Sequence, residues 1–202
     1  MSDQKHTAKN IAIIILAAGQ SSRMGSPKQL LKYRGTTLLQ HSIDAVTESN
    51  ASTLILVLGF GIDEIEKQLN QDQVIIVKNP GWESGMASSI RCGISKIRNE
   101  FKDTDAVIIM VCDQPYVSSD LLNKLILTHQ TSGKAIIASH YNQTLGTPAL
   151  FHKSMFNELI ALEGDRGAKV LFSKFPEETA SVEFKDGSID IDTDENYKNL
   201  AK

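Results

Sequence analysis

Four short apolar runs, rich in β-branched residues, limit the possible fold of this chain more than any other feature. They are Ile11–Leu16, Thr53–Leu58, Val74–Val77 and Ala106–Cys112. Continuous apolar runs of this length are typical of strands buried on both faces, as in a parallel sheet. The segments between the runs carry apolar residues at helical spacing. This alternation predicts right-handed βαβ units.

The second half of the chain is less regular. Lys134–Ser139 and Thr147–Phe151 are predicted strands, SVEF and SIDID are predicted short alternating strands, and Asp194–Ala201 is a predicted closing helix. We find no internal repeat and no interdomain linker. The sequence therefore predicts an α/β fold, a single-domain, Rossmann-like, three-layer α/β/α arrangement around a mostly parallel mixed sheet.

Length and composition suit one soluble domain. The chain has 202 residues, of which 41% are hydrophobic, and its formal net charge is −3. We expect one domain over residues 11–202, preceded by a polar, disordered tail over residues 1–10. The negative charge offers no basic field for nucleic acid or an anionic membrane. The N-terminus lacks the apolar segment of a signal peptide, and Cys92 and Cys112 have the apolar neighbours of reduced core thiols. A cytoplasmic protein is therefore expected.

The loop after the first run is small, basic and glycine-bearing. It reads LAAGQSSRMGSPKQLL from Leu16 to Leu31. The small residues at 17–19 would let backbone N–H groups approach a phosphate closely, and Arg23 and Lys28 add two cations. Ligands of open α/β sheets bind beyond the carboxyl ends of the strands, where this loop is expected. The pattern favours an anion-binding loop over a surface loop whose charges have no specific role.

This loop resembles the signature LAAG-x-S-x-R-M-G-x-x-K-x-L of nucleotidyltransferases with a glycosyltransferase-A-like fold. More specifically, the chain resembles the molybdenum cofactor cytidylyltransferase group of the MobA-like nucleotidyltransferases. Further segments that agree are NPGWESGMASSIRCGI at 79–94, VCDQPYVSSDLL at 111–122, GTPALF at 146–151, GDRGAKVLF at 164–172 and DIDTDENY at 190–197.

The resemblance implies a magnesium-dependent enzyme. It would transfer CMP from CTP to the terminal phosphate of the molybdopterin cofactor, forming molybdopterin cytosine dinucleotide and pyrophosphate. LAAG, where guanylyl relatives tend to LAGG, points to CTP. Transient contact with a molybdoenzyme or its chaperone is also implied. Two alternatives stay open: a different phosphate acceptor, such as a sugar or polyol phosphate, and a delivery module without catalysis.

Asp113 follows the run AVIIMVC directly, and a carboxylate at that place suits Mg²⁺. A helix N-cap is the alternative, but the helix signal at Ser118-Ser119 lies further on. The resemblance implies a second metal carboxylate at Asp192, with Asp190 as the fallback. It also implies that Lys28, Arg23 and Asp113 carry the catalysis.

Nucleotide contacts are expected from the glycine loop, from the end of the second strand and from the start of the third helix. At the last position, helix capping is an alternative role, and at the second a glycine would let a base lie close to the sheet edge. The expected nucleotide-binding residues are Leu16, Ala17, Ala18, Gly19, Arg23, Lys28, Gly59, Ser88 and Ser89.

The acceptor is expected to lie between two loops of the second half. The expected residues are Gly146, Thr147, Pro148, Asp165 and Arg166. Relatives often have GHP where this chain has Gly-Thr-Pro, so an imidazole is missing there. Asp165 and Arg166 are equally compatible with an internal ion pair. Trp82 could stack on a flat ligand such as a pterin or pack in the core.

Overall fold

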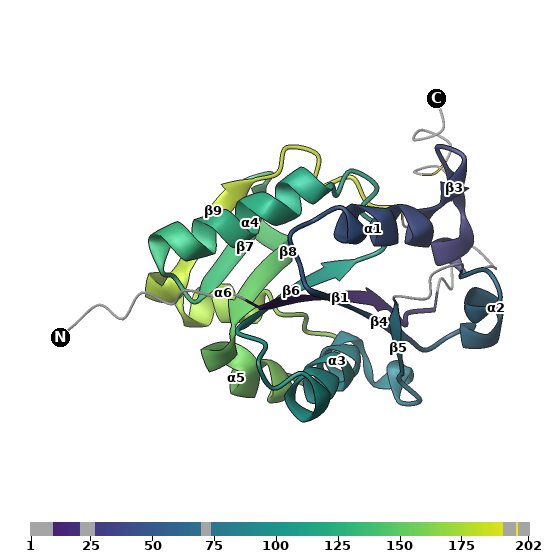
Figure 1. Cartoon of the computed structure of the whole chain (residues 1–202), viewed down its shortest axis with the longest axis horizontal. Coiled ribbons are helices and arrows are strands. Elements are labelled where there is room, and N and C mark those ends of the chain that lie inside the picture. The colour runs from purple at the N-terminus through teal and green to yellow at the C-terminus, as the bar shows by residue number, and fades with distance from the viewer. Residues whose placement is uncertain (1–9, 21–26, 70–73, 192–196, 198–202) are drawn as a thin grey trace.

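A computed structural model describes residues 10–20, 27–69, 74–191 and 197 of the chain. Helices lie on both faces of a central twisted sheet, as Figure 1 shows. The expected three-layer α/β/α fold with a mostly parallel mixed sheet is confirmed.

The sheet has seven strands in the order β5-β4-β1-β6-β8-β7-β9. β1 lies in the middle of the parallel part, between β4 and β6, and β8 pairs antiparallel with both β6 and β7. The strand bounds are β1 Ile11–Ala17, β4 Thr53–Leu58, β5 Ile75–Lys78, β6 Ala106–Val111, β7 Ile136–Tyr141, β8 Thr144–His152 and β9 Thr179–Glu183. The carboxyl ends of β1, β4, β5 and β6 therefore meet at one edge, where a ligand site is expected.

Two helical layers enclose the sheet. Alternate residues of β1 point into two separate cores: Ile13 and Ile15 pack with α1, α2 and α4, whereas Ile14 packs with α3, α5 and α6. This two-sided burial explains why the strand reads as an uninterrupted apolar run. The helix bounds are α1 Leu38–Thr47, α2 Ile62–Glu66, α3 Met86–Glu100, α4 Ser119–Ser132, α5 Phe156–Ile160 and α6 Val170–Lys174.

A small hairpin connects the glycine loop to α1. It pairs β2 (Lys32–Tyr33) with β3 (Thr36–Thr37). The Thr37 hydroxyl then accepts a hydrogen bond from the backbone N–H of Gln40 at 3.0 Å and caps α1. The expected cap at Ser118 is also present, because the Ser118 hydroxyl accepts from Leu121 N at 3.3 Å.

Several predicted boundaries need correction. The predicted strand Val74–Val77 is β5, Ile75–Lys78, a half-buried edge strand. The prediction of a strand at SIDID is wrong, because the described part, up to Ile191, forms turns instead: Gly187 N donates to Phe184 O and Ile189 N donates to Asp186 O. Ile189 is 40% exposed and Ile191 is buried, so the two do not share a face. The predicted helix Asp194–Ala201 lies outside the described residues except for Tyr197.

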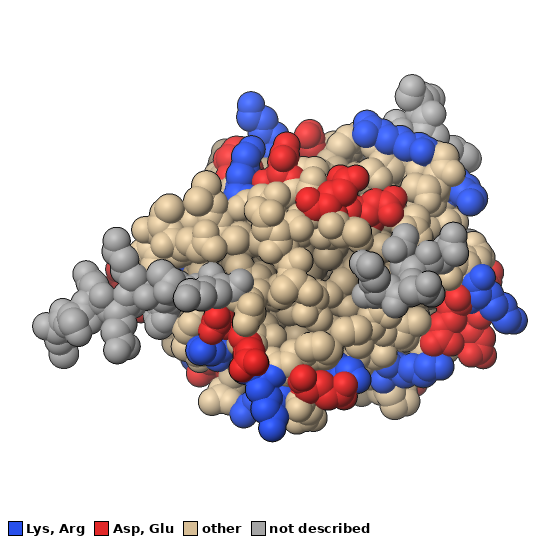
Figure 2. Space-filling model, in the orientation of Figure 1, with Lys and Arg blue, Asp and Glu red and all other residues tan. Residues whose placement is uncertain are grey.

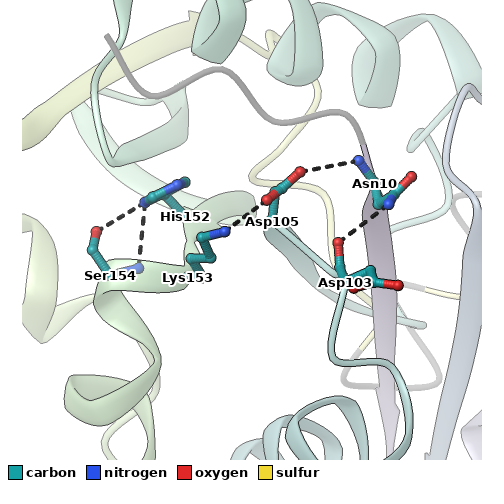
Figure 3. Close-up of polar contacts among 6 residues, drawn as sticks. All are labelled: Asn10, Asp103, Asp105, His152, Lys153 and Ser154. Carbon is teal, nitrogen blue, oxygen red and sulfur yellow. Dashed lines mark hydrogen bonds and ion pairs between the residues drawn. The ribbon is translucent and has the colours of Figure 1, made fainter. Parts of the chain in front are cut away.

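The amino ends of the parallel strands are joined by polar contacts (Figure 3). The Lys153 ammonium donates to Asp105 Oδ1 at 2.8 Å, and the Asn10 side-chain amide donates to the Asp103 carbonyl at 3.2 Å. Asp105 directly precedes β6, and Lys153 directly follows β8. At this end of the sheet, therefore, an ion pair and hydrogen bonds link neighbouring chain segments.

On the face shown in Figure 2, acidic and basic side chains are interspersed, as expected for a chain of net charge −3. Within the described residues, none of the helices has both the length and the apolar character needed to cross a bilayer.

Candidate active site

A cavity of about 410 Å³ opens at the carboxyl ends of β1 and β6. Ala18 and Gly19 line it directly after β1, and Asp113 lines it two residues beyond the end of β6. Lys28 and Gln29 enter from the short 3-10 turn Lys28–Leu30. The glycine loop and the DQP carboxylate are thus brought to one site by the parallel pairing of β1 with β6.

Lys28 and Asp113 face each other in this cavity. The Lys28 ammonium donates to Asp113 Oδ2 at 2.5 Å, and the two side chains are 20% and 16% exposed. The other oxygen, Asp113 Oδ1, is buried and accepts no hydrogen bond. Buried polar atoms normally have a partner, so this oxygen is suited to a cation that binds with the substrate.

The second metal carboxylate remains a prediction. Asp192, like Arg23, lies outside the described residues. Asp190 is described and exposed, and the backbone N–H of Ile191 donates to the Asp113 carbonyl at 3.1 Å, so the chain beside Asp190 reaches Asp113. The described residues contain no group of three or more histidine, cysteine or acidic side chains able to hold a metal.

Gln29 belongs to the site and was not predicted. Its side chain is 1% exposed, and its amide donates to the carbonyl oxygens of Ala17 at 2.9 Å and Gly19 at 3.3 Å. It therefore fixes both ends of the AAG segment. The only signal in the sequence was a polar residue between Lys28 and an apolar Leu30, which reads equally well as an exposed position.

The two serines at the start of α3 have different surroundings. Ser89 lines the cavity, whereas Ser88 does not and donates its hydroxyl proton to the Gly85 carbonyl at 2.8 Å. Both hydroxyls accept hydrogen bonds from the buried side chain of Asn79. Neither serine is the N-cap of α3, which is Gly85.

Gly59 has a packing role that differs from the predicted one. A Cβ at this position would lie 2.6 Å from Trp82 Cβ and 2.8 Å from the Ala18 carbonyl oxygen. Trp82 therefore occupies the space that was expected to admit a base, and Gly59 does not line the cavity. The Trp82 ring itself does line it and packs edge-on against Phe60, with ring centroids 5.6 Å apart.

The Gly-Thr-Pro segment lies at the start of β8, behind Asp113. None of its residues lines the cavity, and Thr147–Pro148 is a cis peptide. A Cβ at Gly146 would meet the Tyr141 hydroxyl, 1.9 Å away. Burial raises the pKa of Tyr141, the negative charges of Asp190 and Asp113 add to the increase, and hydrogen bonds with Gln114 and Thr147 oppose it. The segment is thus part of a polar cluster beside the carboxylates.

Of the second pair of acceptor residues, Asp165 lines the cavity and Arg166 does not. Both side chains are exposed, and no ion pair joins them in the described structure. Cys112 also lines the cavity, but burial raises the pKa of its thiol to about 12, so it is a neutral wall residue and not a nucleophile.

The predicted nucleotide-binding residues therefore separate into three groups. Those that line the cavity are Leu16, Ala17, Ala18, Gly19, Lys28 and Ser89. Gly59 and Ser88 lie just outside it, and Arg23 lies outside the described residues.

Comparison with known proteins gives a match to a protein family. The sequence model of a family described as "MobA-like NTP transferase domain" matches residues 13–180. The nicotine blue oxidoreductase of Paenarthrobacter nicotinovorans is 27% identical over 199 residues, which are 93% of this chain and 94% of that protein. The molybdenum cofactor cytidylyltransferase of Escherichia coli K12 is 28% identical over 188 residues, 93% of each chain.

A solved structure shows the same fold. The crystal structure of Rv0371c from Mycobacterium tuberculosis H37Rv superposes with a TM-score of 0.82 at 29% sequence identity. The match covers 96% of this chain and 98% of that chain. The shared architecture therefore extends over nearly the whole length of both proteins.

Proposed function

Because the chain belongs to the MobA-like NTP transferase family, we propose that it transfers CMP from CTP to the terminal phosphate of a molybdopterin-type cofactor. The family makes the chain a nucleotidyltransferase. The choice of CTP and of the molybdopterin acceptor is supported by the LAAG sequence and by similarity to a molybdenum cofactor cytidylyltransferase.

The observation that carries this proposal is the position of Lys28 against Asp113. An ammonium and a carboxylate, 2.5 Å apart, line one cavity together with the small residues that follow β1. Nucleotidyl transfer needs this combination, because negative charge develops on the phosphate oxygens and must be stabilised by fixed positive charge and N–H groups.

The residues of this chain then have defined parts in the reaction. An oxygen of the acceptor phosphate attacks the α-phosphorus of CTP, the bond from that phosphorus to the oxygen bridging to the β-phosphate breaks, and pyrophosphate leaves with the electron pair. Lys28 and the backbone N–H groups of Ala18 and Gly19 stabilise the developing charge, and Arg23 is proposed to join them. Gln29 holds the Ala17 and Gly19 carbonyls, so the loop is preorganised for the phosphates.

The site also suits a magnesium ion. Asp113, with Asp192 or Asp190, would hold it, and the buried Asp113 Oδ1 is an oxygen that lacks a hydrogen-bond partner in the described structure. When bound, Mg²⁺ would neutralise phosphate charge during the transfer.

The acceptor is proposed to lie on the side of Asp165, close to the Gly146-Thr147-Pro148 segment. Asp165 lines the cavity, and Thr147 donates to the Gln114 side chain at 3.3 Å, next to Asp113. Arg166 would contact the acceptor from the rim of the cavity. Delivery of the product to a molybdoenzyme or its chaperone, in the cytoplasm, completes the proposal.

The decisive measurement is pyrophosphate release by the purified protein with Mg²⁺. Each nucleoside triphosphate is supplied in turn, with molybdopterin, molybdenum-loaded molybdopterin, and a sugar or polyol phosphate as acceptors. We expect release with CTP and the molybdenum-loaded pterin. Release with another acceptor would overturn the molybdopterin assignment and keep the reaction class. Absence of release from every combination would overturn nucleotidyl transfer.

A second candidate comes from the similarity to nicotine blue oxidoreductase over 93% of the chain. An oxidoreductase of this kind would change the oxidation state of nicotine blue. We therefore include oxidation of NADH or NADPH, used as probe reductants, with nicotine blue as a parallel assay. Oxidation there, with no pyrophosphate release from CTP, would favour this candidate over the proposed transfer.

A further inference from the structure

The turn segment of residues 187–191 lies beside Asp113. The Gln114 side-chain amide donates to the Gly187 carbonyl at 2.9 Å, and the backbone N–H of Ile191 donates to the Asp113 carbonyl at 3.1 Å. Asp113 and Gln114 are consecutive, so both bonds involve the short stretch of chain that carries the cavity carboxylate. The turn segment is therefore held at both of its ends relative to Asp113.

Gln114 is buried, and its hydrogen-bond partners determine the orientation of its amide group. The residue is 5% exposed. A backbone carbonyl can only accept a hydrogen bond, so the NH₂ group must face Gly187. The amide oxygen then faces the Thr147 hydroxyl, which donates to it at 3.3 Å. One side chain therefore links β8, the chain that follows β6 and the turn segment.

Tyr141 packs against the same linkage. Its hydroxyl takes part in hydrogen bonds with Gln114 and Thr147. A Cβ at Gly187 would lie only 2.3 Å from Tyr141 Cδ1, so the ring needs a glycine at this point of the turn segment. Because close-packed neighbours leave little room for displacement, this contact adds to the hydrogen bond from Gln114. The position of Gly187 thus depends on packing as well as on hydrogen bonding.

Asp190 lies within the turn segment and is exposed. The residue after it, Ile191, is fully buried in a small core with Tyr33 and Leu38. The chain is therefore anchored before Asp190, at Gly187, and directly after it. The second carboxylate of the proposed magnesium site belongs to this part of the sequence. Groups that orient a metal ligand from behind typically change metal affinity about 10- to 100-fold when they are lost.

We propose that Gln114 is a positioning residue that holds the turn segment against Asp113, so that the second carboxylate of the magnesium site faces the same cation as Asp113. Gln114 does not line the cavity, so it acts through the Gly187 carbonyl and not by contact with the nucleotide or the metal. This inference rests on the proposed function, because the cation is the Mg²⁺ of that reaction.

The test replaces Gln114 by methionine, which has a similar length and no hydrogen-bond donor. Mn²⁺ takes the same oxygen ligands as Mg²⁺ and serves as the probe. It is titrated into the protein with a CTP analogue that has a methylene group between the α- and β-phosphorus atoms, and free Mn²⁺ is measured by electron paramagnetic resonance against the analogue alone. We expect the Mn²⁺ dissociation constant of Gln114→Met to rise about ten-fold or more.

A kinetic measurement separates positioning from a direct part in the chemistry. The Mg²⁺ concentration that gives half-maximal pyrophosphate release should rise in Gln114→Met by a similar factor. Saturating Mg²⁺ should restore the turnover number toward that of the wild type, because Gln114 touches neither substrate nor metal.

Amide hydrogen exchange reports the position of the turn segment without any ligand. The Ile191 N–H should exchange faster in Gln114→Met, because the segment loses its neighbouring anchor. Gln40→Met is the matched control, since it removes an amide that donates to Asp44 within α1 at 2.8 Å, and it should change neither Mn²⁺ binding nor this exchange. If Gln114→Met does not fold, as judged by circular dichroism, Gln114→Asn, whose amide is one methylene shorter, replaces it.

Three outcomes would overturn the inference. They are an unchanged Mn²⁺ dissociation constant in the Gln114 variant, unchanged exchange of the Ile191 N–H, and a loss of turnover that saturating Mg²⁺ does not restore. A wild-type protein that binds no Mn²⁺ beyond that held by the analogue is a different result, because it would overturn the magnesium site of the proposed function itself.

Discussion

The Lys28 ammonium lies 2.5 Å from Asp113 Oδ2 although 85 positions separate the two residues in the sequence. Both side chains are mostly buried, and because the cost of removing the two charges from water offsets their attraction, the pair is expected to contribute little net free energy of unfolding. Its importance is chemical. In the proposed reaction Lys28 supplies positive charge beside the phosphates, and the buried Asp113 Oδ1, which has no hydrogen-bond partner in the described structure, is the proposed ligand of a cation.

We expect Lys28→Met to lower turnover at least ~100-fold, because it removes a main electrostatic stabiliser of the transition state. The measurement is the steady-state rate of pyrophosphate release, together with the urea midpoint as a check of the fold. Lys96→Met, which removes a partly exposed lysine paired with Glu100 on α3, is the matched control. Turnover near the wild-type value in Lys28→Met would remove Lys28 from the mechanism.

Cys112 gives a prediction for pH. Burial raises the pKa of its thiol from 9.0 to about 12. Below pH 9 the thiol is protonated in both the folded and the unfolded states, so it has no effect on the pH dependence there. Between pH 9 and 12 the unfolded state loses the proton and the folded state keeps it, so the free energy of unfolding falls as pH rises, by at most about 1.4 kcal/mol per pH unit.

Urea unfolding at pH 8, 9, 10 and 11 measures this slope. We expect the decline above pH 9 to be shallower in Cys112→Ala than in the wild type. Cys92→Ala should change the slope less, because Cys92 is only partly buried. Identical slopes in the wild type and in Cys112→Ala would show that the thiol ionises as readily in the folded protein as in the unfolded chain.

At the scale of elements, α3 determines the shape of the cavity wall opposite Lys28. The helix begins after Gly85, whose φ of 91° only glycine adopts readily, and Met86 and Ser89 from its first turn line the cavity. Gly93 then lets the helix lie close to the sheet. A Cβ there would lie 2.8 Å from Ile14 Cγ2 and 3.4 Å from Val57 Cγ2.

We expect Gly93→Val to lower the free energy of unfolding by about 1–3 kcal/mol, because extra methyl groups in a well-packed contact force neighbouring atoms apart. Equilibrium urea unfolding checks this value. Ser95→Val places the same side chain on the exposed side of the same helix and should change stability by less than about 0.5 kcal/mol. Equal effects of the two substitutions would show that helix propensity, and not the contact with the sheet, sets the cost.

At the scale of the whole molecule, the two ends of the sheet have different surroundings. At the carboxyl ends of the parallel strands, charged groups such as Lys28 and Asp113 face a cavity. At the amino ends, the carboxylate of Asp105 is joined to Lys153 and to the Asn10 N–H (Figure 3). Asp105 and Asp113 flank the same strand, β6. Substitutions at these two positions therefore compare the two ends of the sheet directly.

We expect Asp105→Asn to lower the free energy of unfolding by up to about 1 kcal/mol, as for a surface ion pair, and to leave pyrophosphate release near the wild-type rate. Asp113→Asn should do the opposite, with turnover reduced at least ~100-fold and little change in stability. Urea unfolding and pyrophosphate release on both variants make the comparison. Loss of turnover in Asp105→Asn would contradict the division between a structural and a chemical end.

Local sequence was sufficient for features whose physical cause is local. The apolar run of β1 predicted a strand buried on both faces, and helical spacing with Ser118 as a cap predicted α4. The rule that ligands bind beyond the carboxyl ends of strands brought the glycine loop and Asp113 together, because both follow strands of one parallel sheet. The family followed from a motif within one continuous stretch.

Only the tertiary structure decided the features that depend on partners distant in the sequence. From the sequence, Gln29 looks like a surface residue. In the structure its amide donates hydrogen bonds to the Ala17 and Gly19 carbonyls. At Gly59 the sequence predicted space for a base, but in the folded protein Trp82 packs against this glycine. The SIDID segment alternates like a strand yet forms turns, because no neighbouring strand pairs with its described part. Burial and hydrogen-bond polarity are properties of the assembled neighbours, so residue order alone could not supply them.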